Sequence, residues 1–359
     1  MMNEIFVESE ILQAWFQKNQ RELPWRQTKD PYLIWISEII LQQTRVAQGL
    51  AYYQRFTGRF PTVQNLAEAE QVEVLKYWQG LGYYSRARNL HEAARDIWYR
   101  LHGVFPDQYN EVLKLKGIGE YTAAAIVSFA WNQPYPVVDG NVYRVLGRLF
   151  AIPTPIDTGK GKKEFGALAA SLMPPDSAGA HNQAIMEFGA LQCIPQQPDC
   201  ASCPLVLRCM GYATGNPQQF PVKQNKTKIR DRYLNYFLIV NNTDTYIRRR
   251  SGKDIWEGLF EFPLIETISR IDLTDLHREA TFHQLFCDIG QPVYTVMADN
   301  VKHVLTHQVL YTTFYKVVIQ HENPALKTFL KIPLSSLDDY PFPKLISAVL
   351  QKMMILAYR

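Results

Sequence analysis

Four cysteines gather in one short stretch of this 359-residue chain, and no other feature constrains its folding as much. They are Cys193, Cys200, Cys203 and Cys209, spaced Cys-x6-Cys-x2-Cys-x5-Cys. The chain does not start with basic residues followed by an apolar run, so we expect a cytoplasmic, non-secreted protein whose thiols stay reduced. Four reduced thiols at this spacing indicate a shared cation rather than disulfides. The fifth cysteine, Cys287, stands alone, and we expect it to be a small buried side chain.

Two kinds of metal site accept four thiolates, a tetrahedral zinc ion and a 4Fe-4S cluster. Structural zinc sites usually take their ligands from two Cys-x2-Cys turns, whereas this sequence has one such turn between two wider loops. The spacing therefore favours the iron-sulfur cluster, with zinc as the alternative. Four unrelated buried cysteines are the third interpretation.

The length and the composition leave room for two domains. Hydrophobic residues form 47% of the chain, which suffices for two cores at about 100 to 200 residues per domain. The net charge of +4 permits binding to nucleic acid without requiring it. No apolar stretch reaches the roughly 18 residues of a membrane span, so we expect a soluble protein without membrane association, and we expect it to be a monomer.

The first part of the chain has the periodicity of helices. Apolar residues recur at helical spacing from Ile11 to Arg208, and Asp30-Pro31 predicts the start of a helix that continues over Ile34 to Phe56. We predict an all-α domain over residues 1–210. A basic linker is expected over 211–232, where Gly, Pro, Lys and Arg replace the apolar period.

The remaining residues, 233–359, predict an α+β domain built on a small sheet. Two runs rich in β-branched and aromatic residues predict strands, and two other segments predict helices. The strands are expected at Tyr233–Val240 and Val309–Ile319, a turn at Asn241–Asp244, and the helices at Leu273–Phe286 and Lys344–Met354. The whole chain is thus expected to be a multidomain protein of all-α and α+β parts.

A Gly-x-Gly turn interrupts the all-α domain between Leu113 and Ile126. Gly117 and Gly119 permit a close approach of the backbone to a ligand, and the free amides at the start of the next helix favour an anion such as a DNA phosphate. An ordinary αα-hairpin with glycines at its turn explains the same pattern.

The cysteine spacing at the end of a helical domain resembles the endonuclease III superfamily of DNA glycosylases. The Gly117 turn resembles the helix-hairpin-helix of the same proteins, and it precedes the cysteines in the same order. The resemblance implies that the four cysteines hold a structural 4Fe-4S cluster that takes no direct part in the chemistry. It also implies that the hairpin binds DNA.

Two acidic residues are candidates for cleavage of an N-glycosidic bond, which needs a proton for the leaving base and negative charge beside the sugar. Glu38 has largely apolar neighbours three and four positions away on its predicted helix, so we expect burial to raise its pKa. Asp139 directly precedes a helix predicted to start near Asn141. The alternatives are a solvated helix residue for Glu38 and a helix N-cap for Asp139, and the N-cap is compatible with catalysis.

Further segments resemble the adenine DNA glycosylases of the MutY family. They are Leu23–Arg26, Ser37–Thr44, Gly80–Asn89, the Gly117 turn and Asp139–Asn141, in the order of the family. This resemblance implies a base excision repair enzyme that removes adenine mispaired with 8-oxoguanine or guanine in double-stranded DNA.

The resemblance also implies roles for individual residues. Glu38 protonates the adenine, and Asp139 stabilises the oxocarbenium ion or forms a transient covalent adduct with the sugar. Asn141 and Tyr121 hold the intermediate and position the groups. The remaining roles are intercalation into the duplex by Tyr83 and Gln43, and lining of the adenine pocket by Trp25, Arg26, Leu41 and Gln183.

Related bifunctional glycosylases carry a lysine at the position of Tyr121, and its amine forms a Schiff base that leads to strand cleavage. A tyrosine has no amine, so we predict base removal with little or no lyase activity. Two alternatives stay open. One is an endonuclease III-like glycosylase/lyase acting on oxidised pyrimidines, which Tyr121 and the second domain disfavour. The other is a non-catalytic iron-sulfur protein that binds damaged DNA, which the presence of Glu38 and Asp139 disfavours.

The segment Arg248–Pro263 resembles the MutT-like (Nudix-type) domain that ends this family. Residues 264–290 lack the Arg-Glu-x-x-Glu-Glu core that Nudix hydrolysis needs, so we expect this domain to bind rather than hydrolyse. The resemblance implies that it recognises 8-oxoguanine opposite the target adenine.

The family places Phe-Ser-His or Phe-Thr-His against the oxidised base, and the matching residues here are Leu305, Thr306 and His307. Thr306 keeps the hydroxyl and is the expected hydrogen-bonding contact, whereas Leu305 lacks the ring for stacking. Partly buried strand histidines are the alternative interpretation of His303 and His307.

Overall fold

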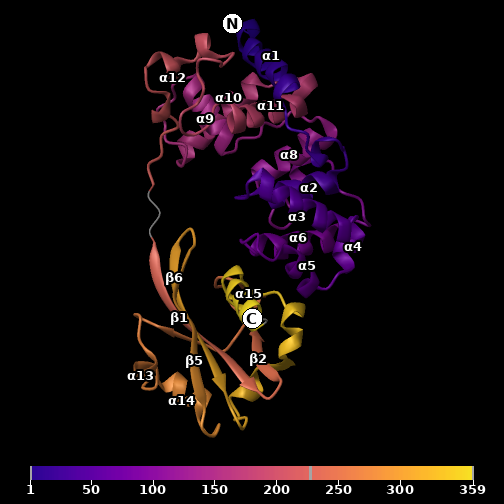
Figure 1. Ribbon diagram of the computed structural model, residues 1–359. Coiled ribbons are helices and arrows are strands. Elements are labelled where there is room, and N and C mark those ends of the chain that lie inside the picture. Colours follow the sequence, from indigo (N-terminus) through magenta and orange to yellow (C-terminus); the bar gives the residue numbers. More distant parts are fainter. Residues whose placement is uncertain (1, 226–228, 358–359) are drawn as a thin grey trace. The chain divides into compact units, whose positions relative to one another are not determined.

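The computed structural model describes residues 2–225 and 229–357, which divide into two compact units (Figure 1). Unit 1 comprises Met1–Glu68 and Asn89–Asn225, and unit 2 comprises Ala69–Arg88 and Lys226–Arg359. Residues 69–88 fall inside the predicted all-α domain in sequence, yet their contacts group them with the C-terminal part of the chain.

The first part of the chain is helical, as predicted. Its helices are α1 (Met2–Asn19), α2 (Pro31–Leu41), α3 (Val46–Arg59), α4 (Val63–Glu68), α5 (Gln71–Trp78), α6 (Ser85–Arg95), α7 (Tyr109–Val112), α8 (Glu120–Trp131), α9 (Gly140–Leu149), α10 (Gly159–Leu172), α11 (Ala178–Leu191) and α12 (Met210–Ala213). Among the described residues, no helix combines the length and the hydropathy that crossing a membrane requires.

The core of unit 1 forms around α11, which contacts α1, α8 and α9. Phe188 of α11 packs with Leu12 and Phe16 of α1 in one buried cluster, and this cluster reaches Leu205 in the cysteine loop. The α2 helix packs against α8. Alanines at 123–125 of α8 are buried, and their small side chains let the two helices approach closely.

The helix predicted to run to Phe56 is interrupted. Asp30 caps its start as expected, because its carboxylate accepts a hydrogen bond from the Tyr32 amide at 2.9 Å. However, α2 ends at Leu41 and α3 begins at Val46, and Gln43 between them has the left-handed φ of 58°. No glycine or proline marks this break, which is why the apolar period alone did not reveal it.

The predicted linker is only partly a linker, because its first fifteen residues, 211–225, belong to unit 1. Phe220 is buried, and the Val222 carbonyl accepts a hydrogen bond from the Ile156 amide at 3.0 Å. Gln224 and Asn225 donate backbone hydrogen bonds to the Asp157 carboxylate. Residues 226–228 lie outside the described residues, and the first strand begins at Arg230 instead of Tyr233.

The described residues of unit 2 include a mixed seven-stranded sheet. Its strands are β1 (Arg230–Asn241), β2 (Asp244–Arg249), β3 (Phe260–Glu261), β4 (Leu264–Thr267), β5 (Val293–Val304), β6 (Gln308–Val318) and β7 (Leu330–Pro333). The order is β3-β2-β1-β6-β5, with β4 also paired to β1 and β7 to β2. Only the β1–β6 pair is parallel among these pairings, and it runs in register from Arg230 and Gln308 to Val240 and Val318.

The central strand β1 is apolar on both faces because both faces are covered. Leu234, Tyr236 and Leu238 belong to a core shared with α15 (Lys344–Ala357). Phe237 and Ile239 point to the other core, shared with α13 (Leu273–Leu276) and α14 (Ala280–Phe286). Alternation along a strand places successive side chains on opposite faces, so two buried faces produce a continuous apolar run.

The α+β prediction for the C-terminal part is confirmed, with two corrections. The helix expected over Leu273–Phe286 is two helices, α13 and α14, separated by three residues, 277–279. Cys287, expected to be buried, is exposed. It follows the last residue of α14, where the chain leaves the core.

Two glycines of α10 give a matched test of the loop on which residues 222–225 dock. A methyl group at Gly161 would lie 2.1 Å from the Pro155 carbonyl oxygen, whereas one at Gly166 would meet nothing within 4 Å. We expect Gly161→Ala to destabilise the protein by about 1–3 kcal/mol and Gly166→Ala to stabilise it by about 0.5–1 kcal/mol. Thermal unfolding followed by circular dichroism measures both, and shifts of the same sign would contradict the described packing.

Candidate active site

One cavity of unit 1 gathers the two predicted catalytic carboxylates, and α2, α8, α9 and α11 contribute to its walls. Its lining includes Trp25, Arg26, Glu38, Leu41, Gln43, Tyr121, Asp139, Asn141, Arg144, Met186 and Glu187. Residues far apart in sequence, which only the resemblance had connected, therefore face one space.

Glu38 lies on α2 with only 6% of its surface exposed. The Tyr121 hydroxyl donates a hydrogen bond to its Oε2 at 2.8 Å. The pKa of Glu38 is raised to about 7, mainly by burial and also by the charge of Asp139, while the Tyr121 hydrogen bond and the charge of Arg26 oppose the rise. The expected rise of this pKa is confirmed, and a solvated helix residue is excluded.

Asp139 is the N-cap of α9. Its Oδ1 accepts hydrogen bonds from the backbone amides of Asn141 and Val142, each at 2.8 Å, and its Oδ2 accepts one from the Asn141 side-chain amide at 2.9 Å. Burial raises the pKa of Asp139, and these hydrogen bonds together with the charge of Arg144 oppose that rise. The N-cap interpretation is confirmed, and the same contacts fix the carboxylate at the cavity.

Arg144 connects the two predicted centres of unit 1 and was missed by sequence reasoning. Its Nη2 donates to the Asn141 side-chain oxygen at 2.8 Å, and its Nε donates to the Cys193 carbonyl at 2.7 Å. It lies three residues after Asn141, on the same side of α9, and this helical spacing is the signal that would have found it.

Three of the four residues expected in the adenine pocket, Trp25, Arg26 and Leu41, line this cavity. Gln43, expected to intercalate, lines it as well. From α11 the lining includes Met186 and Glu187 but not Gln183, whose contact with the adenine stays a prediction. Because Glu187 is four residues after Gln183, it follows one helical turn later along the same side of the helix.

Glu187 is held by two arginines. Arg26 and Arg21 form ion pairs with its Oε2 at 2.7 and 2.5 Å. Burial alone would raise the pKa of Glu187, but the hydrogen bonds from Arg21 and Arg26 lower it to about 2. At pH 7, Glu38 is therefore about half protonated, whereas Glu187 in the same cavity is firmly ionised.

Both residues expected to intercalate have the left-handed backbone conformation. The φ angle of Gln43 is 58° in unit 1, and that of Tyr83 is 47° in unit 2. Residues other than glycine rarely adopt this region, and such residues cluster at functional sites. Half of the Tyr83 surface, 49%, is exposed.

The Gly-x-Gly turn lies between the single-turn helix α7 and α8. Gly117 has a φ of 77°, and a methyl group on it would lie 2.6 Å from the Asn89 side chain, so both conformation and space require glycine. Gly119 is the N-cap of α8 and has no side chain to cap the helix amides. A methyl group there would meet nothing within 4 Å, so the space beside Gly119 is open.

The four cysteines line one cavity at the end of unit 1. Each of their side chains is partly buried, and all four belong to the lining. Burial, with a smaller contribution from the neighbouring cysteines, raises the pKa of Cys203 to about 11. Backbone amides of Leu205 and Gly211 donate to Cys203 and Cys209 respectively, which favours the thiolates.

A buried arginine beside the cysteines tests whether an anionic group fits there. Arg148 is 2% exposed, and no described carboxylate forms an ion pair with it. Its Nη1 lies 3.4 Å from the Cys193 sulfur. A buried cation needs a compensating charge, and a group held by four thiolates supplies one, so the residues fit an iron-sulfur cluster.

The predicted recognition residues of unit 2 occupy the β5–β6 turn. Leu305 packs against the sheet core, and Thr306 and His307 are exposed. The Thr306 hydroxyl and the Tyr83 hydroxyl, both in unit 2, are 2.5 Å apart. His303 is half-buried on β5, as the alternative interpretation held, whereas His307 is not.

The chain was compared with protein families. Residues 36–171 match the family described as HhH-GPD superfamily base excision DNA repair protein, and residues 235–352 match the NUDIX domain. The second match agrees with the MutT-like resemblance, and together the two families account for both the helical part and the sheet.

Named relatives and solved structures agree. The adenine DNA glycosylase of Buchnera aphidicola (subspecies Acyrthosiphon pisum) is 35% identical over 259 residues, which cover 72% of this chain and 74% of that protein. The adenine DNA glycosylase of Homo sapiens is 42% identical over 207 residues, covering 55% of this chain and 38% of the human protein. A thermostable thymine-DNA glycosylase structure has a TM-score of 0.55 at 28% identity, over 59% of this chain and 98% of its own.

An endonuclease III structure in complex with DNA shares the fold at 23% identity, with a TM-score of 0.52 over 60% of this chain and 98% of its own. With a helix-hairpin-helix unit and a Nudix domain in one chain, this protein is a DNA N-glycosylase and belongs to the adenine DNA glycosylase family.

Proposed function

We propose that this enzyme removes adenine paired with 8-oxoguanine or guanine in duplex DNA and leaves the strand intact. The observation that carries this proposal is the buried Glu38 carboxyl, held by Tyr121 in the same cavity as Asp139. An acid with a pKa of about 7 is about half protonated at pH 7, and the protonated form can donate a proton to a departing base.

The two carboxyl groups divide the work because their surroundings differ. Glu38 has one hydrogen-bond donor, Tyr121, and protonates the adenine ring so that it leaves as a neutral base. Asp139 accepts hydrogen bonds from the start of α9 and from Asn141, and these favour its ionised form. The Asp139 carboxylate then stabilises the oxocarbenium ion of the sugar, or adds to it before water completes the hydrolysis.

The walls of the cavity select and hold the base. Trp25 and Leu41 supply apolar surface, and Arg26, oriented by Glu187, supplies hydrogen-bond donors at a fixed position. Gln43 and Tyr83 fill the space that the extruded base leaves in the stack, at an unstacking cost of a few kcal/mol. The hairpin amides after Gly117 and Gly119 bind a DNA phosphate.

The 4Fe-4S cluster is held by Cys193, Cys200, Cys203 and Cys209. When bound, the cluster cross-links the loop that contains its ligands and supplies no group to the cleavage of the bond. Arg148 of α9 compensates the negative charge of the cluster and its thiolates. The enzyme acts as a monomer.

Recognition of the opposite base falls to the Nudix domain. Residues 264–290 lack the glutamate-rich metal site of Nudix hydrolases, so the domain binds without hydrolysing. The exposed Thr306 hydroxyl and the His307 ring offer hydrogen bonds to 8-oxoguanine, while Leu305 is directed into the core and does not stack.

The function is tested directly by incubating the protein with DNA duplexes that hold adenine opposite 8-oxoguanine, guanine or thymine and then applying alkali. We call this the duplex assay. We expect alkali-labile sites at adenine opposite 8-oxoguanine and guanine, and none opposite thymine. The Glu38→Gln variant should lower the single-turnover rate by about 10²- to 10⁴-fold without changing the Kd for DNA, because only the proton donor is lost. DNA binding without excision by the wild-type protein would instead favour a non-catalytic damage-binding protein.

Tyr121 determines the expected fate of the sugar. With no amine at this position, no Schiff base forms, so borohydride should trap little enzyme on DNA during excision. Endonuclease III provides the positive control in the same gel. A high yield of trapped adduct from this enzyme would show that it is a lyase.

The protonation of Glu38 also predicts how stability depends on pH. The pKa of Glu38 is about 7 when folded and 4.5 ordinarily, so the folded state binds the proton more tightly. The free energy of unfolding should therefore fall by about 3 kcal/mol as pH rises through this interval, and Glu38→Gln should remove the fall. Urea unfolding at pH 5 and 8 measures this free energy for the wild type and for Glu38→Gln. An equal pH dependence in both proteins would contradict a raised pKa of Glu38.

A further inference from the structure

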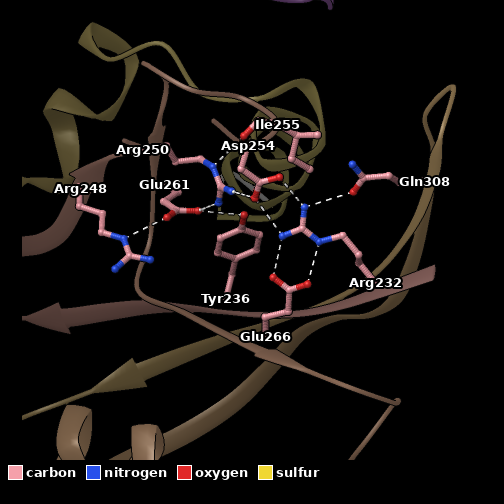
Figure 2. Close-up of polar contacts among 9 residues, drawn as sticks. All are labelled: Arg232, Tyr236, Arg248, Arg250, Asp254, Ile255, Glu261, Glu266 and Gln308. Atoms are coloured by element: carbon pink, nitrogen blue, oxygen red, sulfur yellow. Dashed lines mark hydrogen bonds and ion pairs between the residues drawn. The ribbon is translucent and has the colours of Figure 1, made fainter. Parts of the chain in front are cut away.

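The β5–β6 turn that carries Thr306 and His307 is attached to a buried arginine. Arg232 of β1 is 6% exposed, and Figure 2 shows its guanidinium between two carboxylates. Glu266 accepts two hydrogen bonds from it, at 2.7 and 2.6 Å, and Asp254 accepts two more, at 2.8 and 3.0 Å. Two bidentate pairs leave the planar guanidinium in a single orientation.

One further donor contact of Arg232 reaches the turn. Its Nη1 donates to Oε1 of Gln308 at 3.1 Å, and Gln308 is the first residue of β6 (Figure 2). The Gln308 carbonyl accepts the Leu305 amide at 2.8 Å, which closes the turn. Gln308 therefore closes the turn through its backbone carbonyl, while Arg232 holds its side chain.

Asp254 extends the cluster to a second loop. It forms an ion pair with Arg250 at 2.8 Å, and the Arg250 Nε donates to the Ile255 carbonyl at 3.0 Å. The next residue, Trp256, has the left-handed φ of 62°, and its ring centroid lies 6.1 Å from that of His303. Residues 254–256 and 304–308 line the same pocket of unit 2, so this cluster supports two of its walls.

The charges of this network cancel. Arg232, Arg248 and Arg250 are matched by Asp254, Glu261 and Glu266, and the Tyr236 hydroxyl donates to Glu261 at 3.1 Å (Figure 2). No charge remains to attract an ionic ligand. A neutral network with its hydrogen bonds satisfied fixes geometry, which indicates positioning rather than binding.

We propose that Arg232 is a positioning residue for reading the base opposite adenine, acting through Gln308 on the turn that carries Thr306 and His307. The inference rests on the proposed function, because it concerns the recognition step of that same enzyme. Arg232 does not contact DNA in this account. It sets where the Thr306 hydroxyl is held.

The Gln308→Leu and Gln308→Glu pair tests the link in the full-length enzyme. Leucine removes the acceptor for Arg232, while glutamate keeps it. We measure kcat/KM for adenine opposite 8-oxoguanine and opposite guanine, and we express preference as the ratio. The ratio should fall about tenfold in Gln308→Leu and stay within about twofold of wild type in Gln308→Glu.

Arg232→Met should lower the ratio as Gln308→Leu does, and combining the two changes should add little, because both break one link. Arg248→Met is the matched control, since it removes an arginine that pairs with Glu261 on the side of the network away from Gln308, and it should keep the ratio. If Arg232→Met fails to fold, the ratios measured for Gln308→Leu and Gln308→Glu still test the inference.

Three results would overturn the inference. An unchanged ratio in Gln308→Leu would show that the contact between Arg232 and Gln308 does not affect the preference. An equal fall of the ratio in Gln308→Glu would mean that the Gln308 amide itself contacts the base. A wild-type enzyme that excises adenine without any preference between the two partners would refute the recognition role of the turn and the inference with it. This last result would also contradict the recognition role proposed for the Nudix domain, but not the proposed excision of adenine opposite 8-oxoguanine and guanine, which the duplex assay tests separately.

Discussion

The guanidinium of Arg148 holds together three parts of unit 1 that are distant in sequence. It donates to the carbonyls of Ile194 and Pro195 in the cysteine loop at 2.7 and 2.8 Å. It also donates to the Pro217 and Phe220 carbonyls of the segment after the cysteines at 3.1 and 3.3 Å. Burying a guanidinium is unfavourable unless its donors are satisfied, so these segments and α9 are expected to become ordered together.

The position of the Asp139 carboxylate depends on the same helix. Asp139 precedes the first residue of α9, and Arg144, one turn before Arg148, holds Asn141 in contact with Asp139. A shift of α9 would therefore move the carboxylate and the cysteine loop at once. Glu38 is supported separately, by α2 and by Tyr121 of α8, which keeps its apolar surroundings independent of the polar start of α9.

Local chemistry made much of this structure predictable. The Asp30 and Asp139 caps, the strands around Tyr233–Val240 and Val309–Ile319, and the raised pKa of Glu38 all follow from neighbours within a few residues. The cysteine loop and the two-domain division followed from spacing and composition. The roles of individual residues came from the resemblance and stay predictions, because they depend on how DNA is bound.

Features that depend on distant partners were not predictable in this way. The break at residues 42–45, the docking of residues 211–225 and the exposure of Cys287 are decided by the packing of other elements. No local pattern distinguishes a glycine- and lysine-rich linker from a segment whose carbonyls satisfy a buried arginine. The network around Arg232 was not predictable from local patterns either, because its six charged residues are spread from β1 to β4.

Because that network is neutral, the affinity for DNA and the preference for the opposite base are expected to respond differently to salt. Binding to phosphates releases counterions, so the affinity of a glycosylase for duplex DNA falls as the salt concentration rises. The turn at Thr306 is held by charges that cancel within a few ångströms, and buried pairs are screened little by salt. We therefore expect DNA binding to weaken at high ionic strength, whereas the preference that we propose for the opposite base should stay the same.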